Sequence, residues 1–337
     1  MKRATLKDIA EHLTISVSTV SRALTDDKNI RRETKDAVIE AAQKLGYKPN
    51  PIAKNLKFGR SNTIGVIVPE MVTPYASKVI EGVQQVLYKE GIKVIIAESG
   101  ESWERERDNI ATMEHFMVDG IIICSCDYIH NRAVYEHLLN LGMPVVFFDR
   151  IPHGIEAPQV IVDDYLKSFF LVESLIRSGR KKIVHLHGNS SVYNAYLRAK
   201  AYRDALHKFK INLDEANYVI DCGLSFENGA EAADRLINEG VEFDAIFAFT
   251  DTLAIGAMNR LKERGVKIPH QVAIASFSGT ILSTIVTPPL TTVEPPLTEM
   301  GRESALLILE KIKDSSCPNR SILLDAEIIY RASTEIE

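Results

Sequence analysis

The sequence predicts an α/β protein in which a small helical head precedes a larger body built on two parallel sheets. The first observation is that residues 1–46 contain three short amphipathic helical segments. The second is that, from residue 61 onward, short apolar runs typical of buried strands alternate with helical stretches. This alternation indicates doubly wound parallel sheets covered by helices on both faces. Because a single hydrophobic core stops growing at about 250–300 residues, we expect the body to form two lobes.

The overall composition excludes several classes of protein. The chain has 337 residues, of which 45% are hydrophobic and 25% are charged, so it is not a disordered chain. It contains no apolar run long enough to span a membrane, and charges recur at the N-terminus where a signal peptide needs an apolar stretch. Its four cysteines form no C-x-x-C pair, which is typical of free thiols in a reducing compartment. We therefore expect a cytoplasmic protein with no membrane partner.

The net charge of −5 conceals a division between the two ends of the chain. Residues 1–60 contain 13 Lys and Arg against 7 Asp and Glu, a net charge of +6, whereas residues 61–337 carry a net charge of −11. A basic head of this kind is typical of nucleic-acid binding. Charge alone leaves chance as the alternative, so the assignment depends on the motifs of the head.

The helices of the head are predicted from their caps and their apolar spacing. Thr5 can cap a helix over residues 6–13, because an acidic residue lies three positions on, as in a capping box. Ser16 can cap a second helix over residues 17–24, and a third is expected over residues 32–45. Two helices joined by a short turn, the second with a polar outer face, describe a helix-turn-helix.

The outer face of the second helix has side chains suited to a DNA major groove. Arg22 can donate two parallel hydrogen bonds to guanine, Ser18 can bond several base edges, and Val17 can contact a thymine methyl group. Short hydroxyl side chains nearby are suited to phosphate oxygens. These are Ser16, Thr19, Ser21 and Thr34.

Three runs in the head resemble the DNA-binding domain of the LacI/GalR (lac repressor) family. They are residues 5–10, 16–24 and 46–50, which read TLKDIA, SVSTVSRAL and GYKPN. Thr14 is a departure, because the family often carries Gly or Asn there, and a β-branched residue is strained if the position needs a positive φ. The resemblance implies DNA contacts by Thr5, Leu6, Ser16, Val17, Ser18, Thr19, Ser21, Arg22, Asn29, Thr34 and Tyr47.

Residues 47–60 are expected to form a linker or a hinge helix. Asn50 can cap a helix of about two turns, which is too short to be stable alone in water. A plain linker is one interpretation. The family resemblance implies the other, in which an A-x-x-L segment, here Ala53 and Leu56, folds on DNA and inserts its leucine into the minor groove. Asn50, Ala53, Leu56 and Lys57 therefore join the predicted DNA contacts.

The body is predicted to contain at least eight strands with helices between most of them. The strands are residues 64–68, 94–96, 120–123, 145–148, 160–162, 183–186, 245–249 and 272–275, and the helices include 75–89, 164–178 and 252–264. The body resembles the type I periplasmic-binding-protein fold that the LacI/GalR family uses, which has two lobes and a cleft. Among the matching landmarks are Asp149-Arg150, the run 250–257 and the run 288–293. The likeness covers nearly the whole chain.

The resemblance also implies a division into domains. A head of residues 1–46 and a hinge of residues 47–60 precede an effector-binding and dimerisation domain of residues 61–337. In this family the chain crosses between the lobes three times, and we expect the crossings near residues 160, 291 and 321. The expected N-terminal lobe is residues 61–160 with 291–320, and the expected C-terminal lobe is residues 161–290 with 321–337.

The effector site is predicted from the strands, because ligands of open α/β sheets bind beyond the carboxyl ends of the strands. This rule selects four polar residues: Ser125, Asp149, Thr250 and Ser278. The family resemblance adds two others: Tyr75 and Arg198. Asp251 completes the predicted effector site, although capping of the following helix is its favoured role.

Two departures from the family pattern bear on the effector. Ser278 stands where a carboxylate often accepts bonds from sugar hydroxyls, and Pro295 stands where a Gln is frequent. Because Arg150 and Arg198 are retained, the cleft loses negative charge relative to a typical member. We therefore predict an anionic or differently oriented effector, such as a sugar acid or a sugar phosphate.

No metal or cofactor site is predicted. His185 and His187 alternate on a predicted strand, but no other ligand residue with suitable spacing accompanies them, so we expect buried strand histidines. The sequence has no G-x-G-x-x-G motif after a strand, no Walker A motif and no G-x-S-x-G elbow.

The sequence therefore predicts a transcriptional regulator, most simply a repressor, that is not an enzyme. We expect a homodimer on a palindromic double-stranded DNA operator, because one head contacts only one half-site. A small carbohydrate-type effector between the lobes would control operator affinity. Two alternatives remain open. A solute-binding protein for transport is disfavoured by the basic head, and a sugar-processing enzyme lacks a recognisable general base or nucleophile.

Overall fold

The computed structural model describes residues 4–47 and 60–335 of the chain. It contains two compact units, and the division between them falls after Ser61. We describe the smaller unit, the head, and the larger unit, the body, separately. Among the described residues, no helix is both long enough and apolar enough to cross a membrane.

The head consists of three helices, as the sequence predicts. They are α1 (Leu6–Leu13), α2 (Val17–Leu24) and α3 (Arg32–Lys44). Their apolar faces meet in one small core, whose fully buried members are Ile9, Ala10, Val20, Ala23, Val38, Ala41 and Ala42. Each helix is too short to be stable alone, so this shared core is what holds the head together.

Side-chain caps and one left-handed residue shape the turn between α1 and α2. The Thr5 hydroxyl accepts a bond from the Asp8 N–H, and the Asp8 carboxylate accepts one from the Thr5 N–H at 2.6 Å, which completes the expected capping box. The Ser16 hydroxyl accepts a bond from the Thr19 N–H at 3.0 Å. Thr14 lies between them with φ 55° and ψ 41°, so this β-branched residue adopts the strained conformation that the sequence raised as a possibility.

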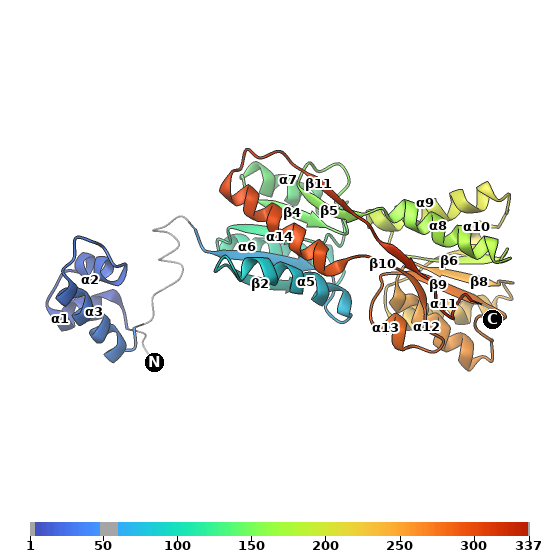
Figure 1. Cartoon of the computed structure of the whole chain (residues 1–337), viewed down its shortest axis with the longest axis horizontal. Coiled ribbons are helices and arrows are strands. Elements are labelled where there is room, and N and C mark those ends of the chain that lie inside the picture. The colour runs from blue at the N-terminus through green and yellow to red at the C-terminus, as the bar shows by residue number, and fades with distance from the viewer. Residues whose placement is uncertain (1–3, 48–59, 336–337) are drawn as a thin grey trace. The chain divides into compact units, whose positions relative to one another are not determined.

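The N-terminal lobe of the body contains a six-stranded parallel sheet in the order β11-β5-β4-β3-β1-β2. Its strands are β1 (Thr63–Val68), β2 (Lys93–Glu98), β3 (Gly120–Ile123), β4 (Val145–Phe148), β5 (Gln159–Val162) and β11 (Ser321–Leu324). The helices α5 (Pro74–Leu87) and α14 (Leu297–Lys313) cover one face of the sheet (Figure 1). The helices α6 (Trp103–His115) and α7 (Arg132–Asn140) cover the other. Both faces are therefore buried, as the continuous apolar strands predict.

The helices α5 and α14 approach each other closely because glycines remove the side chains between them. A Cβ atom on Gly82 would lie 2.0 Å from the carbonyl oxygen of Thr298. A Cβ atom on Gly301 would lie 1.9 Å from the carbonyl oxygen of Val79. No other residue fits at either position without moving a backbone, so the two helices are locked against each other.

The C-terminal lobe contains a second six-stranded sheet in the order β12-β10-β9-β8-β6-β7, in which only β12 is antiparallel to its neighbour. Its strands are β6 (Ile183–His187), β7 (Val219–Asp221), β8 (Ala245–Ala248), β9 (Ala273–Phe277), β10 (Thr291–Glu294) and β12 (Glu327–Ile329). Its main helices pack in two pairs on opposite faces, α8 (Asp164–Arg177) with α9 (Tyr193–Lys208) and α11 (Phe226–Asn238) with α12 (Asp251–Glu263). Two short helices, α10 (Glu215–Tyr218) and α13 (Leu282–Ile285), complete the lobe.

The chain crosses between the lobes three times, but each crossing comes a few residues later than expected (Figure 1). The crossings follow β5, β10 and β11, near residues 163, 295 and 325. The expected bounds near 160, 291 and 321 therefore require correction, because residues 291–294 pair with β9 in the C-terminal lobe and residues 321–324 pair with β5 in the N-terminal lobe. The chain therefore completes a strand in one lobe before it crosses to the other lobe.

His185 and His187 are buried on β6, as the sequence predicts. The His185 ring stacks on Phe247 with a centroid distance of 4.8 Å, and its Nδ1 lies 2.9 Å from the Phe247 carbonyl oxygen. Because a carbonyl only accepts, Nδ1 carries the proton of a neutral ring. Burial, and after it the neighbouring His187, lower the pKa of His185 from 6.5 to about 3.

This lowered pKa predicts a specific loss of stability in mild acid. Between pH 6.5 and 3 the unfolded chain binds a proton that folded His185 does not, so the free energy of unfolding falls as the pH falls. Urea unfolding at about pH 7 and about pH 5.5 should show a loss about 1 kcal/mol larger for the wild type than for His185→Gln. The variant His207→Gln, which changes an exposed histidine of α9, should keep the wild-type loss. Equal losses in all three proteins would contradict this account.

Candidate functional site

The outer face of α2 is open to solvent and carries side chains expected to contact DNA. Val17, Ser18 and Arg22 are exposed, and Ser21 is half-buried. They lie opposite the core residues Val20 and Ala23 of the same helix. The head therefore presents these side chains together from one helix.

The other residues expected to contact DNA fall into four groups. Thr5 and Asn29 are exposed, and Thr34 is half-buried. Leu6 and Tyr47 pack against the head core with part of each side chain accessible. The Ser16 hydroxyl bonds the Ser18 and Thr19 hydroxyls at 2.7 and 2.8 Å, so it is engaged in the helix cap. Asn50, Ala53, Leu56 and Lys57 lie outside the described residues.

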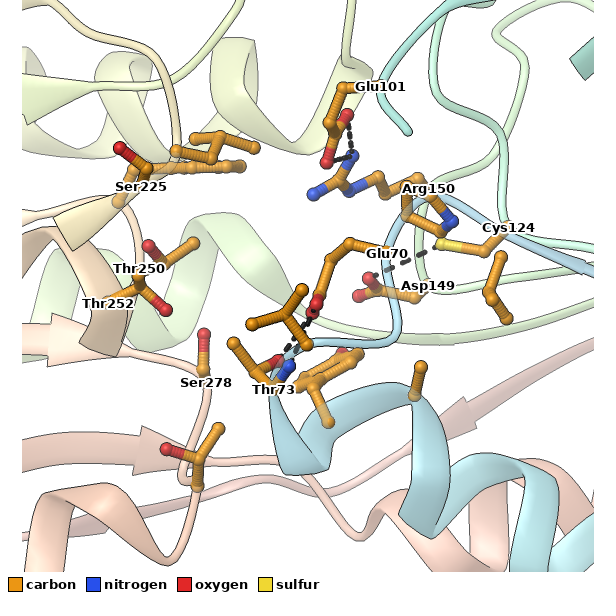
Figure 2. A pocket seen from close by; sticks show the side chains of 18 of the residues that line it. Glu70, Thr73, Glu101, Cys124, Asp149, Arg150, Ser225, Thr250, Thr252 and Ser278 are labelled. Atoms are coloured by element: carbon orange, nitrogen blue, oxygen red, sulfur yellow. Dashed lines mark hydrogen bonds and ion pairs between the residues drawn. The ribbon is translucent and has the colours of Figure 1, made fainter. Parts of the chain in front are cut away.

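A cavity of about 510 Å³ lies between the two lobes of the body. It is lined by the loops that follow β1, β2, β3 and β4 on one side and β7, β8 and β9 on the other (Figure 2). The starts of α5 and α9 complete the walls. Its volume is typical of a small-molecule site. The carboxyl ends of both sheets therefore meet at one cavity, as expected for ligand sites in open α/β sheets.

Five of the seven residues expected to bind an effector line this cavity. They are Tyr75, Asp149, Arg198, Thr250 and Ser278. Ser125 does not line it, because its side chain is buried and its hydroxyl lies 2.7 Å from the Tyr135 hydroxyl behind the cavity wall. The strand-end rule places Ser125 at the correct edge of the sheet but leaves the direction of its side chain open.

Asp251 is neither a cap nor part of the cavity wall. Thr250 caps α12 instead, since its hydroxyl accepts a bond from the Leu253 N–H at 3.3 Å. The Asp251 carboxylate accepts bonds from the Ser276 and Thr292 hydroxyls, each at 2.7 Å. It also accepts bonds from the backbone and hydroxyl of Thr280. Asp251 therefore joins β9, β10 and the loop between them beneath the cavity.

Asp149 has an unusual environment within the cavity. It follows β4 with φ 56° and is buried, and its Oδ2 accepts a weak bond from the Cys124 thiol at 3.9 Å. Its Oδ1 has no partner among the described residues, and neither has the Oδ1 of Asn194 on the facing wall. Burial and then the Asp149 charge raise the pKa of Tyr75 well above its ordinary value, so Tyr75 is neutral. The cavity thus offers hydrogen-bond acceptors that await donors.

The two arginines of the cavity are each held by a carboxylate of their own lobe. Arg198 bonds Asp164 at 2.7 Å and donates to the Phe249 carbonyl oxygen at 2.6 Å. Its guanidinium also lies 3.7 Å from the ring centroid of Phe277. Arg150 and Glu101 form the second pair, described further below. The predicted anionic or differently oriented effector stays a prediction, and the pairing of both arginines weighs against its anionic form.

Sequence reasoning missed several residues of the cavity. They include Glu70, Glu101, Asn194, Leu224, Phe226 and Glu227. Glu70 and Glu101 follow β1 and β2, so the strand-end rule could have found them had it been applied to every strand. Glu70 accepts bonds from the N–H and hydroxyl of Thr73, which holds the start of α5 against the cavity. No local signal marks Asn194, which enters the cavity from inside a helix.

Two family models match this chain. One describes bacterial regulatory proteins of the LacI family and matches residues 5–50. The other describes periplasmic binding proteins and the sugar binding domain of the LacI family and matches residues 61–331. The chain belongs to the LacI family. It is therefore a DNA-binding transcriptional repressor with an effector-binding domain, and the family is not enzymatic.

Individual relatives cover nearly the whole chain. The transcriptional repressor CytR of Escherichia coli K12 is 31% identical over 98% of this chain and 96% of its own length. The repressor PurR of Vibrio atlanticus is 30% identical over 98% of this chain and 99% of its own length. A LacI family regulator from Enterococcus faecium, solved with bound ribose, is 26% identical, with a TM-score of 0.71 over 81% of this chain and 98% of that one.

Proposed function

We propose that this LacI family repressor binds a palindromic operator as a cytoplasmic homodimer, and that a neutral sugar or sugar derivative between the lobes controls its operator affinity. The unpartnered acceptors of Asp149 and Asn194 carry the proposal. A buried polar atom without a partner costs about 1–3 kcal/mol, and sugar hydroxyls would supply the missing donors. Bound ribose in the related regulator from Enterococcus faecium supports this class of ligand.

Charge in the cavity supports a neutral ligand. The lining residues include four carboxylates, on Glu70, Glu101, Asp149 and Glu227, and both arginines are already paired. An anion would meet this excess of negative charge in a partly desolvated space, where like charges repel strongly. A neutral polyol would not.

The two lobes provide the means of control. A ligand shifts an equilibrium between lobe arrangements only if it binds one arrangement better than the other. Asp149 belongs to the N-terminal lobe and Asn194 to the C-terminal lobe, so a ligand that bonds both favours one spacing of the lobes. A change in that spacing would alter DNA binding through the hinge. The hinge residues Ala53 and Leu56 lie outside the described part of the chain.

Asp149→Asn tests the effector role. Binding of neutral sugars, measured by thermal shift and calorimetric titration, should weaken at least tenfold, because hydrogen bonds to a charged acceptor contribute about 1.5–3 kcal/mol each. Operator affinity without ligand should stay unchanged in a gel-shift assay. Asp221→Asn, which changes an exposed carboxylate of β7, is the control. If only sugar acids or sugar phosphates bind the wild type, the neutral ligand is excluded.

The exposed face of α2 supports sequence-specific DNA recognition through Arg22. This guanidinium can form two parallel bonds with the O6 and N7 atoms of guanine. Ser18 and Val17, which are also exposed on α2, would contact neighbouring bases. The hydroxyl residues at the start of the helix would contact phosphates.

Arg22→Ala should relax specificity at one base pair of each half-site and cost roughly 1–3 kcal/mol there. Binding to a set of single-base operator variants measures this. Lys28→Ala removes the same charge from an exposed site beyond α2 and should weaken all variants equally. A uniform loss with Arg22→Ala would instead assign Arg22 to a phosphate.

The N-terminal lobe carries the surface that supports a homodimer. The strand β2 is an edge of its sheet, and the groove between β2 and α5 is lined by apolar side chains that include Ile80, Ile92 and Val94. Tyr88, at the end of α5, is 81% exposed and lines the same groove. The same surface of a second copy of the chain would cover both the apolar side chains of the groove and Tyr88.

Tyr88→Glu should convert the dimer to a monomer in sedimentation velocity and weaken binding to the full operator, because each head then binds alone. Tyr330→Glu changes an exposed tyrosine outside this groove and should leave the dimer intact. A stable dimer in Tyr88→Glu would move the interface to another surface.

A further inference from the structure

We propose that Glu101 sets the charge selectivity of the effector cavity by occupying Arg150, which would otherwise bind anionic ligands. The proposal rests on the effector role of the cavity and concerns which class of ligand it rejects. It makes Glu101 a specificity-determining residue, although no part of the ligand needs to touch it.

The geometry of the pair is the first observation. Arg150 follows β4, and its Nη1 atom lies 2.9 Å from Oε1 and 2.8 Å from Oε2 of Glu101, so one donor bridges both carboxylate oxygens (Figure 2). The Arg150 side chain is 10% exposed and that of Glu101 is 32% exposed. Both line the cavity. The guanidinium is therefore fixed in the wall, and the carboxylate is its more accessible partner.

Arg150 differs from the second arginine in how its charge is matched. Arg198 is held by Asp164, which does not line the cavity, and each side chain of that pair is only 4% exposed. Among the described lining residues, Arg150 is the cation whose counter-ion also faces the cavity. A single substitution at Glu101 therefore changes the charge that a ligand meets.

The energetics follow from burial. Burial alone lowers the pKa of Arg150, but the Glu101 carboxylate raises it beyond its ordinary value, so the guanidinium stays charged. Removing one partner of a buried ion pair leaves an uncompensated charge, which is unfavourable. A phosphate or carboxylate presents the same oxygen geometry to a guanidinium as the Glu101 side chain does. An anion would therefore restore what the substitution removes.

The test compares Glu101→Gln and Glu101→Asn with the wild type, using inorganic phosphate as the probe in calorimetric titrations at constant ionic strength. Both variants remove the charge, and Gln keeps the size of the side chain. Phosphate should bind the variants at least tenfold more tightly than the wild type. The full chain is used, and circular dichroism reports folding. Glu90→Gln makes the same charge change at an exposed site of the same lobe and should not alter phosphate binding.

The double variant Glu101→Gln/Arg150→Met locates the effect. Loss of the gained phosphate affinity in the double variant supports the proposal, because the affinity then depends on Arg150. An equal gain in Glu101→Gln and Glu90→Gln would overturn it, as would no gain in either folded Glu101 variant. So would a gain that persists without Arg150. These titrations need no operator, so their failure is distinct from a failure of sugars to alter operator binding.

Discussion

Parallel strand pairing is the constraint on which the working parts of the body depend. A parallel pair needs a crossover connection, so every strand of such a sheet ends at the same edge. Asp149 follows β4 and Thr250 follows β8, and the crossings bring these two edges to one cavity. The direction of the chain therefore creates the cavity, and side chains at the loop positions decide what it binds.

Charges around the cavity are balanced within each lobe. Arg150 is paired with Glu101 in the N-terminal lobe, and Arg198 is paired with Asp164 in the C-terminal lobe. A change in the spacing of the lobes therefore leaves both ion pairs intact. The hydrogen bonds of Asp251 are also confined to one lobe, since all its described partners belong to the C-terminal lobe. The lobes can thus move as units without exposing an unpaired buried charge at these positions.

The helices of the head could be predicted from signals within a few residues. The lobe to which each strand of the body belongs depends on pairing between residues far apart in the sequence, so it was predicted less accurately. Thr5 and Ser16 act on their own helices, so their caps are readable from a few residues. The lobe of a strand depends on distant partners, which is why residues 291–294 and 321–324 required reassignment. The alternation of strands and helices, by contrast, was sufficient for the fold class.

The site shows the same limit. Position after a strand identifies which residues lie at the cavity edge, but whether a side chain enters the cavity depends on its neighbours in space. Ser125 turns to Tyr135, and Asp251 turns to hydroxyls beneath the wall. The pairing of Arg150 was not predictable for a related reason, because Glu101 lies 49 residues from Arg150 and nothing local links them.

The glycine contacts between α5 and α14 have a mechanical consequence. The two helices meet backbone to backbone at Gly82 and Gly301, so they cannot slide or roll past each other as helices separated by side chains can. One end of α5 lines the cavity with Tyr75, and its other end, about 20 Å away, leads to the exposed Tyr88. The pair of helices α5 and α14 therefore moves as one rigid unit. A displacement at the cavity end of α5 is transmitted to the outer surface of the lobe.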